Sequence, residues 1–239
     1  MTVKAIGFDL DDTLYSRGDF YRYVFEVMQS SIIKLDTSFE RFFEIFQYFS
    51  DNEYDKFIRR QKDKDAYKND RVIDTYQELG VTISQDEAII FNALYLYFRD
   101  KISLRKGVKK LFDLLLEHGY ELFVLTNGPS ADQRNKLKQL NINQYIMEEN
   151  WFISDELDYT KPDIEIFKKV EKKLGFESEE ILYIGDDYVN DIVGASNAEW
   201  KTIFMNIHGN EEIIDNKTAV TNFSEIIHYL KNDENFFKN

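Results

Sequence analysis

The chain contains no cysteine, which excludes thiol catalysis, disulfide bonds and zinc bound by thiolates. Its three histidines, His118, His208 and His228, lie far apart and lack the H-x-x-x-H spacing of a helical zinc site. Proline is nearly absent, and both copies, Pro129 and Pro162, stand beside polar segments. Any metal site in this sequence is therefore expected to use oxygen ligands.

Two further absences concern membranes and nucleic acids. The sequence has no apolar run of about 18 residues and does not begin with a basic, apolar leader. We therefore expect a cytoplasmic protein that neither spans nor binds a membrane. The formal charge of −14 disfavours binding to nucleic acid, because a broadly acidic surface repels phosphate backbones. A small phosphorylated partner remains compatible, since a metal ion and a lysine can reverse the field inside one cleft.

The first apolar run ends in a cluster of acids. Residues 3–8 read as a short buried strand, and Asp9, Asp11 and Asp12 follow it directly. Carboxylates clustered at the end of a buried strand repel one another, and burial disfavours their charge further. A bound divalent cation is the simplest way to offset this cost, although a solvated acidic turn would give the same pattern.

Residues 16–103 are polar, rich in aromatic side chains and helical in periodicity, with no convincing strand. Apolar stripes at helical spacing begin at Phe20, Phe39 and Val72. Ser84 and Glu87 have capping-box spacing and open a fourth helix. The segment is therefore predicted to be a separate module of at least four helices. Its Tyr and Phe side chains are interpreted mainly as core residues.

From residue 104 onward the pattern alternates between helices and strands. The predicted strands in this part are 120–125, 151–154, 181–184 and 201–205. The predicted helices are 108–116, 129–140, 163–174, 192–198 and 223–230. Such alternation indicates a parallel sheet covered on both faces, with ligands outside the carboxyl ends of its strands. The predicted fold is α/β, with a three-layer α/β/α, Rossmann-like core over 1–15 and 104–239 and a helical domain over 16–103.

Polar residues of an unusual kind follow three of these strands. They are Asp9 and Asp11 after the first, Thr126 and Asn127 after the second, and Asp186, Asp187, Asn190 and Asp191 after a later one. Lys161 lies in the connecting segment 159–163. Because the ends of parallel strands share one edge of the sheet, these side chains are expected to converge there.

The chemistry of such a site can be worked out from its residue types. Carboxylates without His or Cys make an oxygen-rich site, which suits Mg²⁺. A lysine ammonium and a threonine hydroxyl are suitable donors to phosphate oxygens. Phosphoryl transfer needs in-line attack and neutralisation of charge, and a carboxylate can be the nucleophile. A second carboxyl two residues further along can protonate the leaving oxygen and then activate water.

Four ordered segments resemble the motifs of the haloacid dehalogenase-like hydrolase superfamily. They are Asp9-Leu10-Asp11-Asp12-Thr13, Thr126-Asn127, Lys161-Pro162-Asp163 and Gly185-Asp186-Asp187…Asn190-Asp191. Residue type, order and placement at strand ends all match. The helical segment after the first motif resembles the C1-type cap of this superfamily, which would open for substrate and close to exclude water. One departure is Ile164, where such families often have a second proline.

The resemblance implies a catalytic and a metal-binding set. Asp9 would be the nucleophile that forms an aspartyl-phosphate, and Asp11 the general acid and base. Asp9, Asp11 through its backbone region, and Asp186 would hold Mg²⁺. Asp191 would lie in the inner or outer coordination sphere of the same ion.

The resemblance also implies a phosphate-binding set. Thr126 and the backbone of Asn127 would bind phosphate oxygens. Lys161 would neutralise charge on the nucleophile and on the phosphate. Asp187 would either ligate the metal or cap the next helix.

Together these roles imply a Mg²⁺-dependent phosphatase of small phosphorylated metabolites. Haloacid dehalogenases of the superfamily need no metal and lack a carboxylate at the second position, so Asp11 and Asp186 favour phosphate chemistry. Phosphonate hydrolysis would need a lysine in the cap that forms a Schiff base. The lysines there, Lys34, Lys56, Lys62, Lys64 and Lys68, have polar, charged surroundings that are typical of a solvated face.

Three other functions stay open at this level. A phosphomutase would reuse the aspartyl-phosphate, and the sequence separates it poorly from a phosphatase. A non-enzymatic, Mg²⁺-dependent phospho-Asp switch would be about half this length, without the helical insert. A binding protein that had lost turnover would be expected to lack Asp9 or Asp11. The sequence decides neither the oligomeric state nor the choice among nucleoside monophosphates, sugar phosphates and acylated amino-sugar phosphates.

Overall fold

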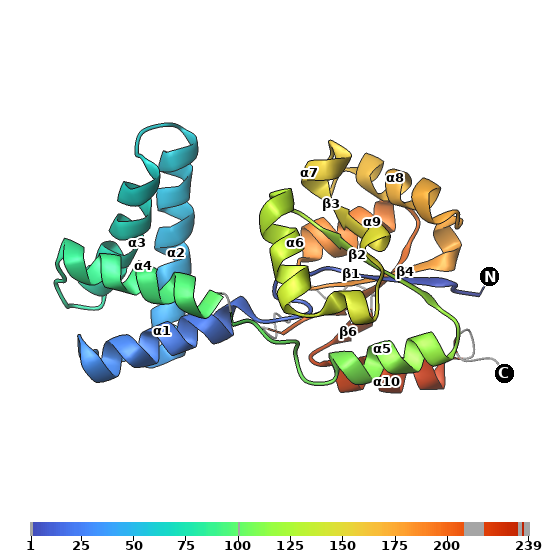
Figure 1. Ribbon diagram of the computed structural model, residues 1–239, viewed down its shortest axis with the longest axis horizontal. Helices are drawn as coiled ribbons and strands as arrows, with labels where there is room; N and C mark the ends of the chain where they lie inside the picture. Colours follow the sequence, from blue (N-terminus) through green and yellow to red (C-terminus); the bar gives the residue numbers. More distant parts are fainter. Residues whose placement is uncertain (1, 100, 208–217, 234–235, 237–239) are drawn as a thin grey trace. The chain divides into compact units, whose positions relative to one another are not determined.

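The computed structural model describes residues 2–99, 101–207, 218–233 and 236, so His208 lies outside the described residues. The chain divides into two compact units (Figure 1). One, here called the core unit, consists of Met1–Ser16 and Ser103–Asn239, and the other, the helical unit, of Arg17–Ile102. Each unit has its own buried apolar cluster.

The core unit is built on a parallel sheet, as predicted. Its strands are β1 (Ala5–Phe8), β2 (Glu121–Thr126), β3 (Trp151–Ile153), β4 (Ile181–Gly185), β5 (Lys201–Met205) and β6 (Thr218–Val220). Their order is β3-β2-β1-β4-β5-β6, and every neighbouring pair is parallel. The first strand of the chain is thus an inner strand, between β2 and β4. Hydrophobic periodicity carries no signal for β6, which has only three residues.

Helices cover both faces of this sheet (Figure 1). α8 (Ile164–Leu174) and α9 (Gly194–Asn197) lie on one face, and α5 (Val108–Glu117) and α10 (Phe223–Asn232) on the other. The remaining elements here are α6 (Ser130–Gln139), α7 (Ser154–Leu157), the 3-10 helices η1 (Ile142–Gln144), η2 (Glu148–Asn150) and η3 (Ser178–Glu180), and the π-helix η4 (Tyr188–Val193). The three-layer α/β/α prediction is therefore confirmed.

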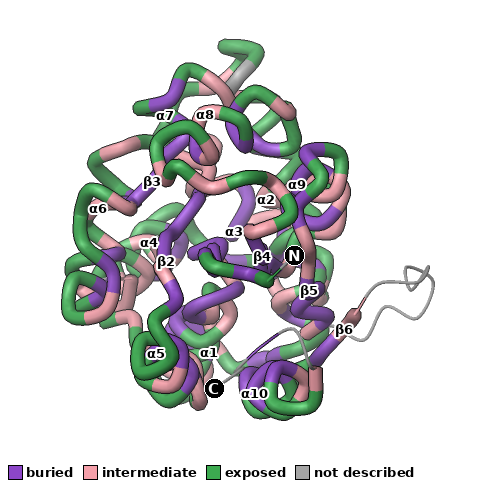
Figure 2. The backbone as a smooth tube through the Cα atoms, turned by 90° about the vertical axis from the view of Figure 1, so that its right-hand side faces the viewer, coloured by how far each residue is buried: buried purple, intermediate pink, exposed green. Residues whose placement is uncertain are grey.

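The strands alternate their side chains between the two layers. Phe123 and Tyr183 belong to the cluster that packs against Phe167 of α8, whereas Phe8 packs edge-on against Phe112 of α5 with ring centroids 5.1 Å apart. Figure 2 shows the result, with buried strands inside and exposed residues along the outer sides of the helices. Gly7 is required between these layers, because a Cβ there would lie 2.2 Å from the ring of Phe123.

Two sequence-based boundaries need correction. Ser154 begins α7 and is not the last residue of a strand. The helix predicted over 192–198 begins earlier, as the π-helix η4, and continues as α9. The cause is Asp187, whose Oδ1 accepts hydrogen bonds from the backbone amides of Val189 and Asn190 and so starts the helical turn directly after β4.

The helical unit consists of α1 (Arg17–Ser31), α2 (Phe39–Ile58), α3 (Lys64–Glu78) and α4 (Gln85–Arg99). The capping box at Ser84 and Glu87 is present, with hydrogen bonds in both directions. The helices enclose aromatic side chains, among them Phe42, Phe46 and Phe91. No helix in the described parts of the chain combines the length and apolar character needed to cross a bilayer.

Candidate active site

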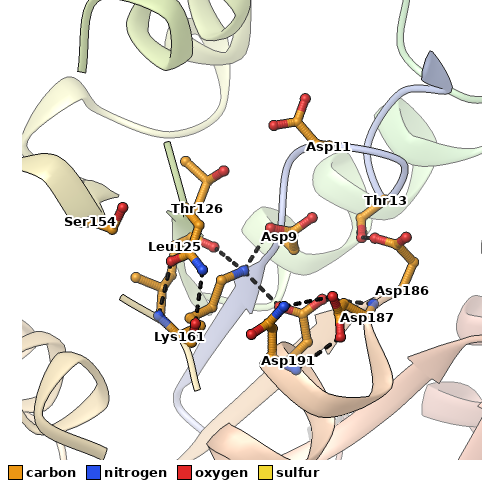
Figure 3. Close-up of polar contacts among 12 residues, drawn as sticks. Asp9, Asp11, Thr13, Leu125, Thr126, Ser154, Lys161, Asp186, Asp187 and Asp191 are labelled. Carbon is orange, nitrogen blue, oxygen red and sulfur yellow. Dashed lines mark hydrogen bonds and ion pairs between the residues drawn. The ribbon is translucent and has the colours of Figure 1, made fainter. Parts of the chain in front are cut away.

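The predicted site residues meet at the carboxyl edge of the sheet (Figure 3). Asp9 follows β1, Thr126 ends β2 and Asp186 follows β4, and these three strands are neighbours. Parallel strands bring their ends together in this way regardless of the distance along the chain. The sequence predicted that these side chains would lie at one edge of the sheet, and the strand order places them there.

Lys161 lies at the centre of this group, with 4% of its surface exposed. Its Nζ donates to Asp9 Oδ1 at 2.7 Å and to Asp191 Oδ1 at 2.6 Å. It also donates to the Tyr183 hydroxyl at 3.0 Å and to the Leu125 carbonyl at 3.2 Å. Burial alone would lower the pKa of Lys161, but Asp191 and Asp9 raise it well above its ordinary value. Lys161 is therefore a fixed positive charge.

Three carboxylates form one group, and two of them, Asp9 and Asp191, contact Lys161. Asp9, Asp186 and Asp191 each offer an oxygen, and these oxygens all lie within 4.8 Å of one another. Burial raises the pKa of Asp9 well above its ordinary value, and Asp191 and Asp186 add to this, while Lys161 opposes it. One lysine does not neutralise three acids, and oxygen donors of this kind suit Mg²⁺. The donor set thus fits a divalent cation.

Two backbone features of the fourth motif, at Gly185 and Asp187, fix the position of the Asp191 carboxylate. A Cβ at Gly185 would lie 2.3 Å from Asp191 Oδ2, so only glycine lets this carboxylate sit against the end of β4. The Asp187 amide donates to the same oxygen at 3.0 Å. Of the two roles considered for Asp187, the cap is observed, and its carboxylate is outside the group of three.

Thr13 supports the neighbouring acid. Its hydroxyl donates to Asp186 Oδ1 at 2.8 Å, and the side chain is completely buried. The bond joins residues 173 positions apart in the chain. The last residue of the first motif therefore orients a carboxylate of the fourth.

Asp11 lies apart from the three clustered carboxylates (Figure 3). Lys136 Nζ donates to both of its oxygens, at 2.7 and 3.0 Å, Gln133 Nε2 donates at 2.7 Å, and the Tyr15 hydroxyl also donates. Burial would raise the pKa of Asp11, but Lys136, Gln133 and Tyr15 together hold it below its ordinary value. In this geometry Asp11 is an ionised carboxylate. The predicted contribution of its backbone to a metal site stays a prediction.

The second motif is held by side-chain bonds that reach across the site. Gln133 Nε2 donates to Thr126 Oγ1 at 2.7 Å and to the Asn127 carbonyl at 2.9 Å. The side-chain amide of Asn127 forms two hydrogen bonds of 2.9 Å with the backbone of Lys161, donating to its carbonyl and accepting from its N–H. The backbone N–H of Gly128 donates to Ser154 Oγ at 3.0 Å. The loop that carries Thr126 and the loop that carries Lys161 therefore form one connected framework.

Sequence reasoning missed several residues of this framework. Gln133, Lys136 and Tyr183 belong to no motif, and Tyr15 stands at the end of the first stretch without a role of its own. One signal was available for Gln133 and Lys136. They stand three apart on the helix that begins just after the second motif, so they share the helix face nearest that motif.

The chain was also compared with known protein families and proteins. A family model described as haloacid dehalogenase-like hydrolase matches residues 3–199. The pyrimidine 5'-nucleotidase PynA of Streptococcus pneumoniae is 33% identical over 125 residues, which are 52% of this chain and 52% of that protein, so the match spans about half of each. The glyceraldehyde 3-phosphate phosphatase of Methanothermobacter thermautotrophicus is 27% identical over 209 residues, 85% of this chain and 86% of that protein.

Solved structures share the fold. The magnesium-bound HAD-hydrolase YfnB from Bacillus subtilis superposes with a TM-score of 0.68 at 21% identity, covering 96% of this chain and 99% of that one. A dehalogenase superposes with a TM-score of 0.71 at 16% identity, covering 100% of this chain and 99% of that one. At such identities the likeness concerns the fold alone.

Proposed function

The chain belongs to the haloacid dehalogenase-like hydrolase family, and from that premise we propose that it is a Mg²⁺-dependent phosphatase of small phosphorylated metabolites. The observation that carries the proposal is the group of Asp9, Asp186 and Asp191, with the buried ammonium of Lys161 in contact with Asp9 and Asp191. Such a group suits a phosphate ester held by a divalent cation and a lysine. Relatives named pyrimidine 5'-nucleotidase and glyceraldehyde 3-phosphate phosphatase support the same reaction class.

The proposed reaction begins at Asp9. A carboxylate oxygen of Asp9 attacks phosphorus, and the bond from phosphorus to the leaving oxygen breaks. Asp11 gives that oxygen a proton, and for this it must first take up a proton and leave the contacts with Lys136 and Tyr15 that keep it ionised in the structure. Water then attacks the aspartyl-phosphate and passes a proton to Asp11, which releases inorganic phosphate and restores Asp9. Thr126 and the Asn127 backbone hold phosphate oxygens in this scheme, and Lys161 neutralises charge on both the nucleophile and the phosphate.

The metal would be held by Asp9, Asp186 and Asp191, with the Asp11 backbone as the further ligand expected from sequence. When bound, Mg²⁺ supplies charge neutralisation at the phosphate oxygens. The chain itself contributes the fixed geometry. Thr13 orients Asp186, and the Asp187 amide orients Asp191.

The helical unit is proposed to be the cap that selects the substrate. Its place in the chain supports this, since it is inserted directly after the first motif. The finer substrate class stays open between nucleoside monophosphates, sugar phosphates and other phosphate esters. A phosphomutase, a dehalogenase and a phospho-Asp switch are alternatives, and no feature of the described residues favours any of them over hydrolysis.

The test is release of phosphate from a panel of phosphorylated metabolites, with Mg²⁺ and with EDTA. A phosphatase releases phosphate from a few compounds, and EDTA abolishes the release. A sugar-phosphate isomer pair and a 2-haloacid are assayed in parallel, because interconversion or halide release would replace the proposal by a mutase or a dehalogenase. Absence of all three reactions would leave the phospho-Asp switch or a binding protein without turnover.

The nucleophile is tested by Asp9→Asn, which should abolish turnover without changing the fold. An amide is a poor nucleophile, so we expect a loss of at least about 10³-fold in kcat. The matched control is Asp12→Asn, which removes the same charge three residues away. Asp12 has a φ of 63°, a conformation that asparagine adopts readily, so this control should fold and keep its activity. Full activity of Asp9→Asn would remove Asp9 from its role.

A further inference from the structure

Lys161 has an uncharged side-chain partner, the hydroxyl of Tyr183. An ammonium group has three protons to donate, and in the described parts of the chain four oxygens lie within hydrogen-bond distance of Lys161 Nζ. Asp191, Asp9 and Tyr183 are the three nearest acceptors, at 2.6, 2.7 and 3.0 Å. The fourth, the Leu125 carbonyl, is 3.2 Å away and already accepts the Tyr183 O–H at 2.6 Å. The distances therefore assign one proton of the ammonium to Tyr183.

The Tyr183 side chain is held rigidly. It is completely buried, and its ring lies edge-on to those of Phe167 and Trp200, with centroids 6.3 and 5.9 Å apart. Burial raises the pKa of Tyr183 well above its ordinary value, although Lys161 opposes this, so the hydroxyl keeps its proton. Because that proton is donated to the Leu125 carbonyl, a lone pair of the hydroxyl oxygen is left to accept from Lys161.

The hydroxyl reaches this position by crossing a strand. Tyr183 of β4 and Phe123 of β2 are both register partners of Gly7 in β1, and side chains in register point to the same face of a sheet. Gly7 has no side chain, and the ring of Phe123 occupies the space, since a Cβ at Gly7 would lie 2.2 Å from it. The Tyr183 hydroxyl thus bonds to the Leu125 carbonyl of β2, on the other side of β1.

The two charged partners of Lys161 change during the proposed reaction. Asp9 becomes an aspartyl-phosphate, so its carboxylate loses its full negative charge. Asp191 belongs to the group of carboxylates that would hold the metal. Tyr183 takes part in neither event, and its hydroxyl stays neutral. It is therefore the partner that can hold the ammonium in one place before, during and after phosphoryl transfer.

We propose that Tyr183 is a positioning residue, which fixes the ammonium of Lys161 beside the nucleophile throughout turnover. The bond from its hydroxyl to Leu125 also connects Lys161 to β2, the strand that ends in Thr126, the phosphate-binding residue expected from the sequence. The effect on turnover rests on the proposed phosphatase function, whereas the fixed position of the ammonium does not.

The test removes only the hydroxyl, with Tyr183→Phe in the full chain. Phenylalanine keeps the ring contacts, and the Leu125 carbonyl can still accept from Lys161, so the variant should fold like the wild type. Near-ultraviolet circular dichroism and thermal melting check this. The matched control is Tyr76→Phe, since Tyr76 is also completely buried and its hydroxyl has no hydrogen-bond partner within the described ranges.

The first readout is the ¹H–¹⁵N resonance of the Lys161 ammonium in EDTA, assigned by its absence in Lys161→Arg. A buried ammonium that is fixed by its acceptors exchanges protons with water slowly enough to give such a signal. The signal should be the same in the wild type and in Tyr76→Phe. In Tyr183→Phe it should shift and broaden, because one of the three nearest acceptors is lost. An unchanged resonance in Tyr183→Phe, or no resonance in the wild type, would overturn the proposal.

The second readout is kinetic, with Mg²⁺ and an ester that the wild type hydrolyses. In Tyr183→Phe, kcat should fall about tenfold and the inhibition constant of inorganic phosphate should rise about threefold or more, since a displaced ammonium weakens both contacts. Loss of folded protein would lower kcat alone, so a fall in kcat with an unchanged inhibition constant would make Tyr183 a packing residue only. Unchanged values of both would remove it from the reaction. A wild type that hydrolyses no ester contradicts the proposed function, and the resonance then still decides whether Tyr183 fixes Lys161.

Discussion

At the scale of single residues, polar side chains outside the four sequence motifs hold the site residues in place. Gln133 bonds to Asp11, to Thr126 and to the carbonyl of Asn127, so one amide joins the first motif to the second. Lys136 contacts both oxygens of Asp11. The proposed acid and base is therefore positioned by α6, whereas the proposed nucleophile is positioned by Lys161.

This arrangement predicts an effect of Lys136→Met that depends on the leaving group. Without Lys136 the carboxylate of Asp11 loses two hydrogen bonds and its fixed orientation. The pKa of Asp11 should also rise, which favours its protonated form, and we expect the loss of orientation to outweigh this gain. For an alkyl phosphate, whose leaving oxygen needs a proton, kcat/KM should fall about ten- to a hundredfold. For a nitrophenyl phosphate, whose leaving group departs without a proton, kcat/KM should change by less than about threefold.

The quantity kcat/KM is chosen because it reports on the steps up to phosphoenzyme formation. Lys138→Met is the control, since Lys138 is an exposed lysine on the same helix. Equal losses on both esters would mean that Lys136 supports the fold or the phosphate and does not act through Asp11.

At the scale of elements, α2 and α3 are joined by a buried carboxylate. Glu53 of α2 is 1% exposed and accepts hydrogen bonds from Lys56 and Lys62, and Lys62 also contacts Asp70 of α3 at 2.6 Å. Burial would raise the pKa of Glu53, but the bonds from Lys56 and Lys62 hold it below its ordinary value. The ionised form is therefore the one that the folded helical unit stabilises.

Glu53→Gln should lower the free energy of unfolding by about 1.5–3 kcal/mol at neutral pH, since two bonds to charged groups are weakened. A carboxyl with a lowered pKa stabilises the fold above its unfolded-state value of about 4.3. That contribution is lost as the pH falls through the folded-state pKa, so wild type and variant should converge in acid. Urea unfolding at several pH values measures the difference. Glu44→Gln, at an exposed pair, should cost less than about 1 kcal/mol, and a pH-independent difference for Glu53→Gln would contradict the role given to its charge.

Element prediction from the sequence succeeded where one strong local signal was present. β1, β2 and β4 are apolar runs that lead directly to the polar residues Asp9, Thr126 and Asp186, a pattern typical of buried strands that end at a site. The start of η4 was missed because it depends on Asp187 capping two amides, and the residue type alone allowed a metal ligand equally well. Contacts such as Lys136 with Asp11 depend on how α6 is rotated against the sheet, and periodicity does not determine that rotation.

At the scale of the whole molecule, the two units have separate cores. The buried cluster of the helical unit contains residues of α1–α4, the loops between them and no residue of the core unit. A chain of residues 17–102 should therefore fold by itself, with a helical circular dichroism spectrum and a cooperative thermal transition. Phe42→Ala, at a completely buried ring, should cost about 3–5 kcal/mol and abolish that transition. A non-cooperative melt of the unmutated segment would show that the helical unit depends on the rest of the chain.

The position of β1 inside the sheet has a consequence for the order in which the protein is made. The ribosome releases β1 first, but both of its neighbours come later, β2 from residue 121 and β4 from residue 181. Asp9 meets Lys161, which lies 152 positions further along the chain, and pairing over such distances is slow. The helical unit is synthesised before β2 and β4, so it can fold before β1 has any strand to pair with. Newly synthesised or refolding chains should therefore regain helical circular dichroism first and enzymatic activity last.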